Sequence, residues 1–220
     1  MFTRITASDG HEFDCWIEPA RGARKAGIVV LQEIFGVTDQ LKGVARMYAS
    51  HGYEVAIPAL FDRQERGAVI PFGDAPRGRG LMMACDPDAV LRDAAAAAAI
   101  LRANGGKVGV MGFCWGGGLA IRMAQGDDVD AAAAFYGTRL PTYMTAPLRV
   151  PVLAHFGAED SHVPPEMLAE VQAFWPEMET QVYAGAGHAF ANEARPADYV
   201  AEAAQTAHRS TLEFFERHLG

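Results

Sequence analysis

The heptapeptide GFCWGGG, residues 112–118, decides how the rest of the sequence is interpreted. It ends a short apolar run typical of a buried strand and begins a small-residue segment typical of a helix. A sharp turn from strand to helix around the pattern G-x-S-x-G is a nucleophile elbow, and here Cys114 stands at the serine position. Glycines at 112 and 116 suit this turn, because side chains two residues before and after the strained central residue would collide. The pattern predicts a thiol exposed at the carboxyl edge of a sheet.

The same glycine-rich turn also suits a second interpretation, in which Cys114 is a small buried hydrophobe. The context fits an elbow on both sides, and the nearby helix N-terminus favours a thiolate. We therefore favour a nucleophile at this position. Cys15 and Cys85 have no such setting, and we expect both to be structural.

Working outward from the elbow, short apolar runs alternate with segments of helical spacing. Residues 3–19 predict a hairpin with a type I′ turn at Asp9-Gly10, and residues 60–86 predict a surface excursion of the kind that often carries substrate contacts. The other runs predict strands within 26–33, 54–60, 107–113, 130–137, 151–160 and 179–188, and helices within 39–53, 86–106, 116–126, 164–176 and 197–219. This alternation predicts an α/β protein with a mostly parallel sheet covered by helices on both faces. No linker divides the chain, so we expect a single domain over residues 1–220.

Composition narrows the classes of function. The 220 residues carry a formal net charge of −8, which argues against nucleic acid or an anionic membrane as the main partner. No apolar stretch is long enough to span a bilayer, and the first residues lack the apolar run of a signal peptide, so we expect a cytoplasmic protein. Three scattered cysteines favour neither disulfides nor structural zinc. We expect no cofactor, a small-molecule substrate, and a monomer or small homo-oligomer.

A thiol nucleophile needs a base, and the base needs a group that orients it. In this type of fold they follow the nucleophile in the order acid, then histidine, each in a loop after a strand. Asp160 and His188 occupy such positions, and Glu159 is the neighbour that competes with Asp160. His155 lies inside a predicted strand and is expected in the core. His162 could suggest a metal pair with Asp160, but no third ligand is near in sequence, so we expect a solvated loop and no metal site.

One more carboxylate stands out at the end of the first buried strand. Glu33 follows GIVVLQ directly, where an unpaired charge is expensive to bury. This strand end supplies the second oxyanion donor of an α/β-hydrolase, so the backbone N–H of Ile34 would pair with that of Trp115. Glu33 would then point into the same pocket. Taken alone, the residue is equally typical of a loop cap with no chemistry.

Together these segments resemble the dienelactone hydrolases, also called carboxymethylenebutenolidases, over essentially the whole chain. The resemblance rests on QEIFG at 32–36, GFCWGG at 112–117, GAED at 157–160 and GAGHAF at 185–190. It implies an α/β-hydrolase fold and a catalytic triad of Cys114, His188 and Asp160. It also implies that Glu33 keeps the resting thiol neutral and takes its proton when substrate arrives. The implied reaction opens the enol lactone 4-carboxymethylenebut-2-en-4-olide to maleylacetate, in the degradation of aromatic catechols.

The sequence departs from the family pattern where the substrate carboxylate would bind. The resemblance implies an arginine shortly after the histidine loop, where this chain has Asn192. Arg195 lies nearby, and Arg77 and Arg79 are alternative clamps that are equally typical of solvated loop charges. We also take Phe35 and Tyr136 as candidates for substrate binding.

Three alternatives therefore stay open. The first is a carboxylester or thioester hydrolase that acts on a neutral substrate, which Asn192 favours. The second is a catalytically silent binding protein on the same fold, although its expected mark is a broken triad. The third is a cysteine redox sensor, which usually has a resolving cysteine nearby, and none is adjacent to Cys114.

Overall fold

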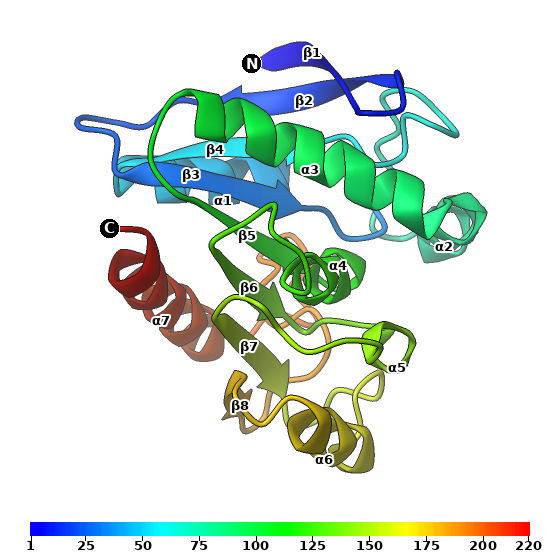
Figure 1. Cartoon of the computed structure of the whole chain (residues 1–220). Coiled ribbons are helices and arrows are strands. Elements are labelled where there is room, and N and C mark those ends of the chain that lie inside the picture. The colour runs from blue at the N-terminus through cyan, green and yellow to red at the C-terminus, as the bar shows by residue number, and fades with distance from the viewer. The chain divides into compact units, whose positions relative to one another are not determined.

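The computed structural model of the chain describes residues 1–220, which divide into two units, Met1–Gly109 and Val110–Gly220 (Figure 1). Strand β5 crosses the boundary between them. Each unit is an α/β arrangement with its own strands and covering helices. Together they contain eight strands and seven helices; the sequence pattern predicts the eight strands and five of the helices.

The strands of the N-terminal unit lie in the order β1-β2-β4-β3. Their bounds are Phe2–Thr6 for β1, Glu12–Glu18 for β2, Ala26–Leu31 for β3 and Tyr53–Pro58 for β4. Strand β3 runs parallel to β4, whereas β2 pairs with both β1 and β4 in antiparallel fashion. All six residues of β3 are buried, as expected for a strand that is covered on both faces.

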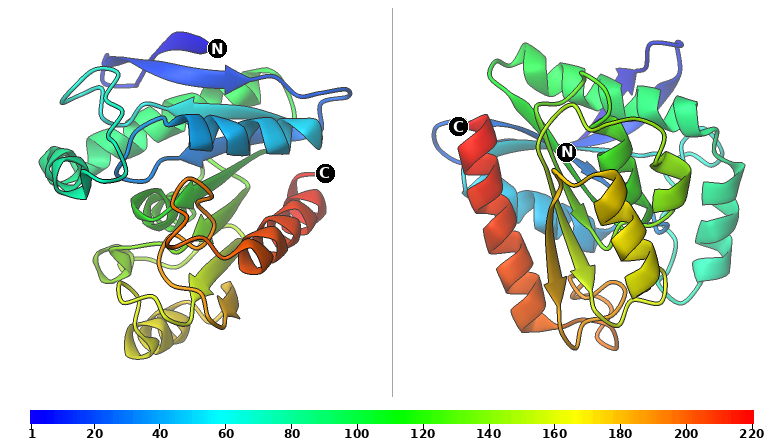
Figure 2. Two further views of the ribbon diagram at one scale, coloured as in Figure 1. Left: turned by 180° about the vertical axis from the view of Figure 1, so that it is seen from behind. Right: turned by 60° about the horizontal axis from the view of Figure 1, so that its bottom comes forward.

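Two helices cover opposite faces of these strands. Figures 1 and 2 show α3 (Pro87–Ala103) on one face and α1 (Asp39–Ser50) on the other. Helix α1 begins after Thr38, whose side chain accepts a hydrogen bond from the N–H of Leu41. Helix α3 has the predicted N-cap Asp86 followed by proline at the first helical position. Both helices therefore begin where the sequence signals predict.

The turn of the N-terminal hairpin differs from the prediction. A type I′ turn needs positive φ at both central residues, but only Gly10, with φ +85°, adopts it here. The N–H of Gly10 donates to the Ala7 carbonyl at 2.9 Å, and the N–H of Ala7 donates to the His11 carbonyl at 2.9 Å. The loop is thus three residues long, with glycine at the left-handed position. Asp9 does not adopt a positive φ, and its carboxylate accepts hydrogen bonds from Arg63 and Arg92.

The excursion at residues 60–86 contains a helix that the sequence pattern does not predict. Helix α2 spans Ala75–Ala84 and begins after Asp74, whose side chain caps the N–H of Arg77. Gly78 is its only buried residue, so the helix has no apolar stripe to reveal its period.

The strands of the C-terminal unit lie in the order β5-β6-β7-β8, and β7 runs parallel to both β6 and β8. Helix α7 lies on one face of these strands, and α4 and α6 lie on the other (Figures 1 and 2). The strand bounds are Val108–Phe113 for β5, Ala131–Phe135 for β6, Val152–Gly157 for β7 and Glu179–Tyr183 for β8. The helix bounds are Trp115–Met123 for α4, Leu140–Tyr143 for α5, Pro165–Phe174 for α6 and Ala201–Leu219 for α7. The one-turn helix α5 is the only element of this unit without a sequence signal.

None of the seven helices combines the length and the apolar character needed to cross a membrane.

Candidate active site

Cys114 lies at the turn between β5 and α4 with strained backbone angles. Its φ is 53° and its ψ is −116°, a region that residues with a side chain rarely adopt. Its N–H donates to the Phe135 carbonyl at 3.0 Å, and its own carbonyl accepts from the N–H groups of Gly117, Gly118 and Thr138. These four hydrogen bonds hold the strained turn in place.

The glycines around Cys114 allow the chain to approach itself closely. A Cβ at position 112 would lie 2.0 Å from the Gly116 carbonyl oxygen, and one at 118 would lie 2.1 Å from the Thr138 carbonyl oxygen. No side chain fits at such distances. The run GFCWGGG can therefore fold as an elbow because glycine, which has no side chain, stands at these positions. Trp115, which follows the cysteine, is buried, and its side chain hydrogen bonds with Tyr143.

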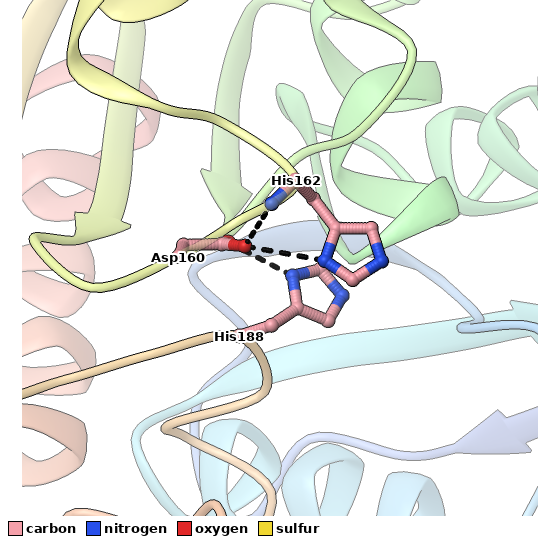
Figure 3. Close-up of side chains that lie close together, drawn as sticks. All are labelled: Asp160, His162 and His188. Carbon is pink, nitrogen blue, oxygen red and sulfur yellow. Dashed lines mark hydrogen bonds and ion pairs between the residues drawn. The ribbon is translucent and has the colours of Figure 1, made fainter.

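The loops after β7 and β8 bring an acid and a histidine together. The Nδ1 atom of His188 lies 2.8 Å from Oδ2 of Asp160. Figure 3 shows the imidazole turned toward this carboxylate. His188 is also hydrogen bonded with Cys114. Glu159 is exposed, so Asp160 is the acid of this pair that contacts the imidazole. The structure therefore connects the three side chains Cys114, His188 and Asp160 within the C-terminal unit.

Electrostatics at this cluster favour a charged imidazole. Burial opposes the charge on His188, but the hydrogen bonds with Asp160 and Cys114 and their negative charges outweigh it and raise its pKa to about 10. For Asp160, burial likewise opposes the charge, yet the contact with His188 and the N–H of His162 lower the pKa of this carboxyl group. The acid is therefore ionised at neutral pH, and the imidazole gains a proton readily.

Tyr136 supports His188 from the end of β6. Its φ is 40°, its N–H donates to the His155 carbonyl at 2.7 Å, and its ring meets that of His188 edge to face at 5.2 Å. The side chain is fully buried. Its ring packs against the imidazole, and the substrate contact expected of Tyr136 stays a prediction.

His155 is a core residue, as its place inside a strand predicts. It is fully buried, and its two ring nitrogens each lie 2.9 Å from a hydroxyl oxygen, those of Tyr183 and Thr211. Burial lowers its pKa to about 3, so the ring is neutral. Its role is structural.

His162 lies closer to the cluster than the sequence predicts. Its Nδ1 is 3.3 Å from Oδ1 of Asp160, its backbone N–H donates to the same oxygen at 2.8 Å, and its ring packs on His188 with centroids 4.1 Å apart. The expectation of a solvated loop holds only for half of the side chain, which is 54% exposed. The third potential ligand that seemed to be missing is His188, which the next strand delivers to the same carboxylate. The spacing of Asp160 and His162, two residues apart in the sequence, was the signal that could have indicated this cluster of potential ligands.

In the N-terminal unit, the segment QEIFG forms the loop after β3. Glu33 is buried with 6% exposure, whereas Ile34 is partly exposed. The preceding residue, Gln32, is fully buried; its side-chain amide donates to the Glu33 carbonyl at 3.2 Å and accepts from the N–H of Leu60 at 3.1 Å. These contacts fix the backbone at the position where the resemblance implies an oxyanion donor.

The excursion at residues 60–86 packs against this loop. The Phe35 carbonyl accepts from the N–H of Ile70 at 2.9 Å, and the Phe35 ring meets that of Phe72 edge to face at 4.9 Å. Gly78 of α2 lies so close that a Cβ there would be 2.0 Å from the Ile34 carbonyl oxygen. The excursion thus supports the loop structurally. The periodicity of apolar residues in the sequence does not reveal such a role. Phe35 itself is buried with 3% exposure.

The polar residues expected to bind a substrate carboxylate have partners in the protein. Arg77 contacts Glu65 at 2.5 Å, and Arg195 contacts Asp198 at 2.7 Å. Asn192 is buried, and its side-chain oxygen accepts from the N–H of Ala194 at 3.1 Å, which makes it a loop cap. Arg79 lines an open surface depression on α2.

Comparisons with known proteins agree with the fold and the motifs. Residues 13–219 match the model of the dienelactone hydrolase family. A carboxymethylenebutenolidase from Pseudomonas putida is 32% identical over 96% of this chain and 93% of its own length. The structure named "Putative Dienelactone Hydrolase from Klebsiella pneumoniae subsp. pneumoniae MGH 78578" is 25% identical, with a TM-score of 0.87 over 99% of both chains. An esterase from Pyrococcus furiosus, at 16% identity and a TM-score of 0.73 over all of this chain and 93% of its own, shares the fold alone.

These matches confirm the α/β-hydrolase fold and a hydrolase that acts on esters or lactones. The chain belongs to the dienelactone hydrolase family.

Proposed function

We propose that this protein opens an enol lactone, or cleaves a related activated ester, through a covalent thioester on Cys114. The observation that carries the proposal is the chain of contacts from Asp160 through His188 to Cys114 at a strained elbow. A structural cysteine would need neither the strained backbone nor a histidine with a raised pKa. The strain and the pKa shift together are typical of an active nucleophile.

Acylation begins with the Cys114 thiolate attacking the carbonyl carbon of the substrate. A C–S bond forms and the ring C–O bond breaks, which releases an enolate. His188, protonated in the resting pair, delivers its proton to that leaving oxygen and becomes neutral. The enolate is a stabilised leaving group, so a thiol suits the reaction better than it would suit an unactivated ester.

Deacylation uses the neutral His188 as a base. It takes a proton from water while the water oxygen attacks the thioester carbon. The C–S bond then breaks, the acid product leaves, and thiolate and imidazolium are restored. Asp160 holds the Nδ1–H of His188 and stabilises the imidazolium, so the other ring nitrogen faces the reaction.

We further propose the N–H groups of Trp115 and Ile34 as the oxyanion hole. The N–H of Trp115 belongs to the first turn of α4, where backbone donors have no carbonyl within the helix. Removal of one donor from such a hole typically costs about 3–4 kcal/mol of transition-state stabilisation.

Glu33 completes the proposal as a proton acceptor for the thiol. Its burial at the end of β3 supports a role beyond loop capping, because an ionised carboxylate in such a place needs a hydrogen-bond donor. In this role Glu33 would accept a hydrogen bond from the neutral resting thiol, take its proton when substrate binds to give the attacking thiolate, and return that proton to the thiolate after deacylation.

The substrate is either an anionic enol lactone or a neutral ester. The relatives' name, carboxymethylenebutenolidase, favours the lactone. The partners of Asn192, Arg77 and Arg195 favour a neutral substrate, since these side chains are engaged within the protein. Of the expected carboxylate clamps, only Arg79 has no ion pair that the structure identifies.

A kinetic panel tests the proposal. It compares kcat/KM for an anionic enol lactone, its neutral methyl ester and a series of aryl esters. Turnover of the anionic lactone at least tenfold above that of the neutral analogue supports the lactone, and the reverse order supports the ester. If Cys114 were labelled stoichiometrically but none of the lactones and esters were turned over, the result would support a catalytically silent binding protein.

A further inference from the structure

Two imidazoles and a carboxylate converge at the carboxyl ends of β7 and β8. Figure 3 shows the rings of His162 and His188 both turned toward Asp160. One ligand atom from each residue lies within 4.8 Å of the other two. Two histidine nitrogens and one carboxylate oxygen form a donor set that Zn²⁺ favours in sites with a fourth position left open.

The three side chains are held in this arrangement before any ion arrives. Asp160 is fixed by the backbone N–H of His162, and the two rings pack against each other at 4.1 Å. The ring of Tyr136 also packs against His188, edge to face at 5.2 Å. A preformed set loses little conformational freedom on binding, which favours affinity.

An ion can reach the cluster from solvent along His162. The His162 side chain is 54% exposed, that of His188 is 14% exposed, and that of Asp160 is buried. The exposed ring therefore provides the first contact, and the buried carboxylate provides the charge that attracts the cation.

We propose that Asp160, His162 and His188 form an inhibitory site for Zn²⁺ and similar first-row divalent ions. The ion bonds to Nδ1 of each histidine and to a carboxylate oxygen of Asp160, with water in the fourth position. The proton on Nδ1 of His188 passes to solvent, and the remaining proton stays on Nε2. The ring of His188 then keeps this proton and cannot accept another.

The inhibitory consequence rests on the proposed function of His188 as the base. With Nδ1 bound to the metal and the Nε2 proton retained, His188 neither protonates the leaving enolate nor takes the proton of the attacking water. Both half-reactions lose the group that moves their proton, so turnover falls. Metal binding itself depends only on the three ligands, so the two parts of the proposal can be tested separately.

The binding test uses the Cys114→Ser variant, because a thiolate is itself a strong zinc ligand. A chromophoric chelator competes for Zn²⁺ with this variant and with Cys114→Ser combined with His162→Ala. We expect one ion per chain in the first protein and at least tenfold weaker binding in the second, since even outer-shell changes cost about 10- to 100-fold. Equal affinity in the two proteins overturns the proposal.

The inhibition test uses the protein with Cys114 in place. Zn²⁺ is titrated against turnover of an ester for the parent, His162→Ala and the control His51→Ala, whose exposed histidine lies after α1. We expect His162→Ala to need at least tenfold more Zn²⁺, His51→Ala to match the parent, and a chelator to restore activity. Circular dichroism verifies folding, and His162→Gln replaces the alanine variant if that one is unstable. If Cys114 and His188 alone capture the ion, all variants are inhibited alike, and the site is rejected.

Discussion

Gly78 of α2 lies directly against the carbonyl oxygen of Ile34, with no room for even a Cβ between them. A Cβ at position 78 would approach that oxygen to 2.0 Å, so one of the two segments would have to move. The carbonyl and the N–H of Ile34 belong to adjoining peptide groups that share its Cα, so a displaced carbonyl would also shift the N–H, the proposed oxyanion donor. Helix α2 can thus pack against the Ile34 backbone only because position 78 is glycine.

We therefore expect Gly78→Ala to lower kcat by about 10- to 100-fold with little change in KM, up to the loss of one oxyanion donor. Gly80→Ala is the matched control, because it lies on the same helix with nothing within 4 Å of its Cβ position. Steady-state kinetics on both variants, with thermal unfolding to verify the fold, gives the measurement. Equal kcat values for the two variants would show that α2 does not position the donor.

Cys114→Ala should abolish hydrolysis and leave the protein folded, because the thiol supplies the bond-forming atom. Cys114→Ser should retain a small residual activity on activated esters only, since a hydroxyl needs stronger base assistance than a thiol. The control Cys85→Ser should keep the parental rate. Mass spectrometry of the acyl-enzyme adds a direct readout, and an acyl adduct on the alanine variant would contradict the assignment.

His188→Ala should lower the rate of acylation more than Asp160→Asn, since the histidine carries the proton and the carboxylate orients and stabilises it. Glu159→Gln changes the exposed neighbour and should behave as the parent. Single-turnover kinetics separates acylation from product release. If Glu159→Gln were inactive and Asp160→Asn unimpaired, the acid of the triad would be Glu159 and the assignment of Asp160 would be wrong.

Glu33→Gln should make the thiol react faster with a neutral alkylating agent at low pH and yet slow ester hydrolysis. In the proposed mechanism, loss of the Glu33 charge eases thiolate formation, while loss of the acceptor slows turnover. The raised pKa of His188 favours thiolate, so under this proposal Glu33 and His188 would act in opposite directions on the resting thiol. The test measures the alkylation rate of Cys114 as a function of pH in the parent and in Glu33→Gln. Superimposable curves would show that Glu33 has no part in the mechanism.

His188 should contribute to stability in a way that depends on pH. Its pKa is raised from 6.5 to about 10 in the folded protein, so folding favours the protonated form. The contribution is fully present below pH 6.5 and is lost as the pH rises through 10. The difference in free energy of unfolding between the parent and His188→Gln, measured by urea titration, should shrink across that window. A difference that is constant from pH 6 to 10 would refute the shift.

Much of this arrangement could be predicted from the sequence, because local chemistry determines it. The elbow glycines, the caps of α1 and α3, and the order of Cys114, Asp160 and His188 are local signals or consequences of the parallel topology. The place of His162 beside His188 is not local. It results from the packing of two loops from neighbouring strands, and no spacing rule relates the two residues.

Other features escaped prediction for different physical reasons. Helix α2 buries only Gly78, so it lacks the periodic pattern by which helices are found. In the hairpin, Asp9-Gly10 is compatible with more than one turn type, and the loop length selected the three-residue form. Asn192 showed a departure from the family pattern, but only the hydrogen bond that its side-chain oxygen accepts from the N–H of Ala194 explained it as a loop cap.

The strained backbone angles of Cys114 lower the stability of the protein at a position where catalysis requires the thiol. A non-glycine residue at a φ of 53° and a ψ of −116° costs about 1–3 kcal/mol, a large share of the roughly 5–15 kcal/mol that keeps a domain folded. Glycine would release that strain and would also remove the thiol. A laboratory selection for thermostability alone would therefore tend to replace the nucleophile itself, and selection for this chain needs a catalytic readout at every round.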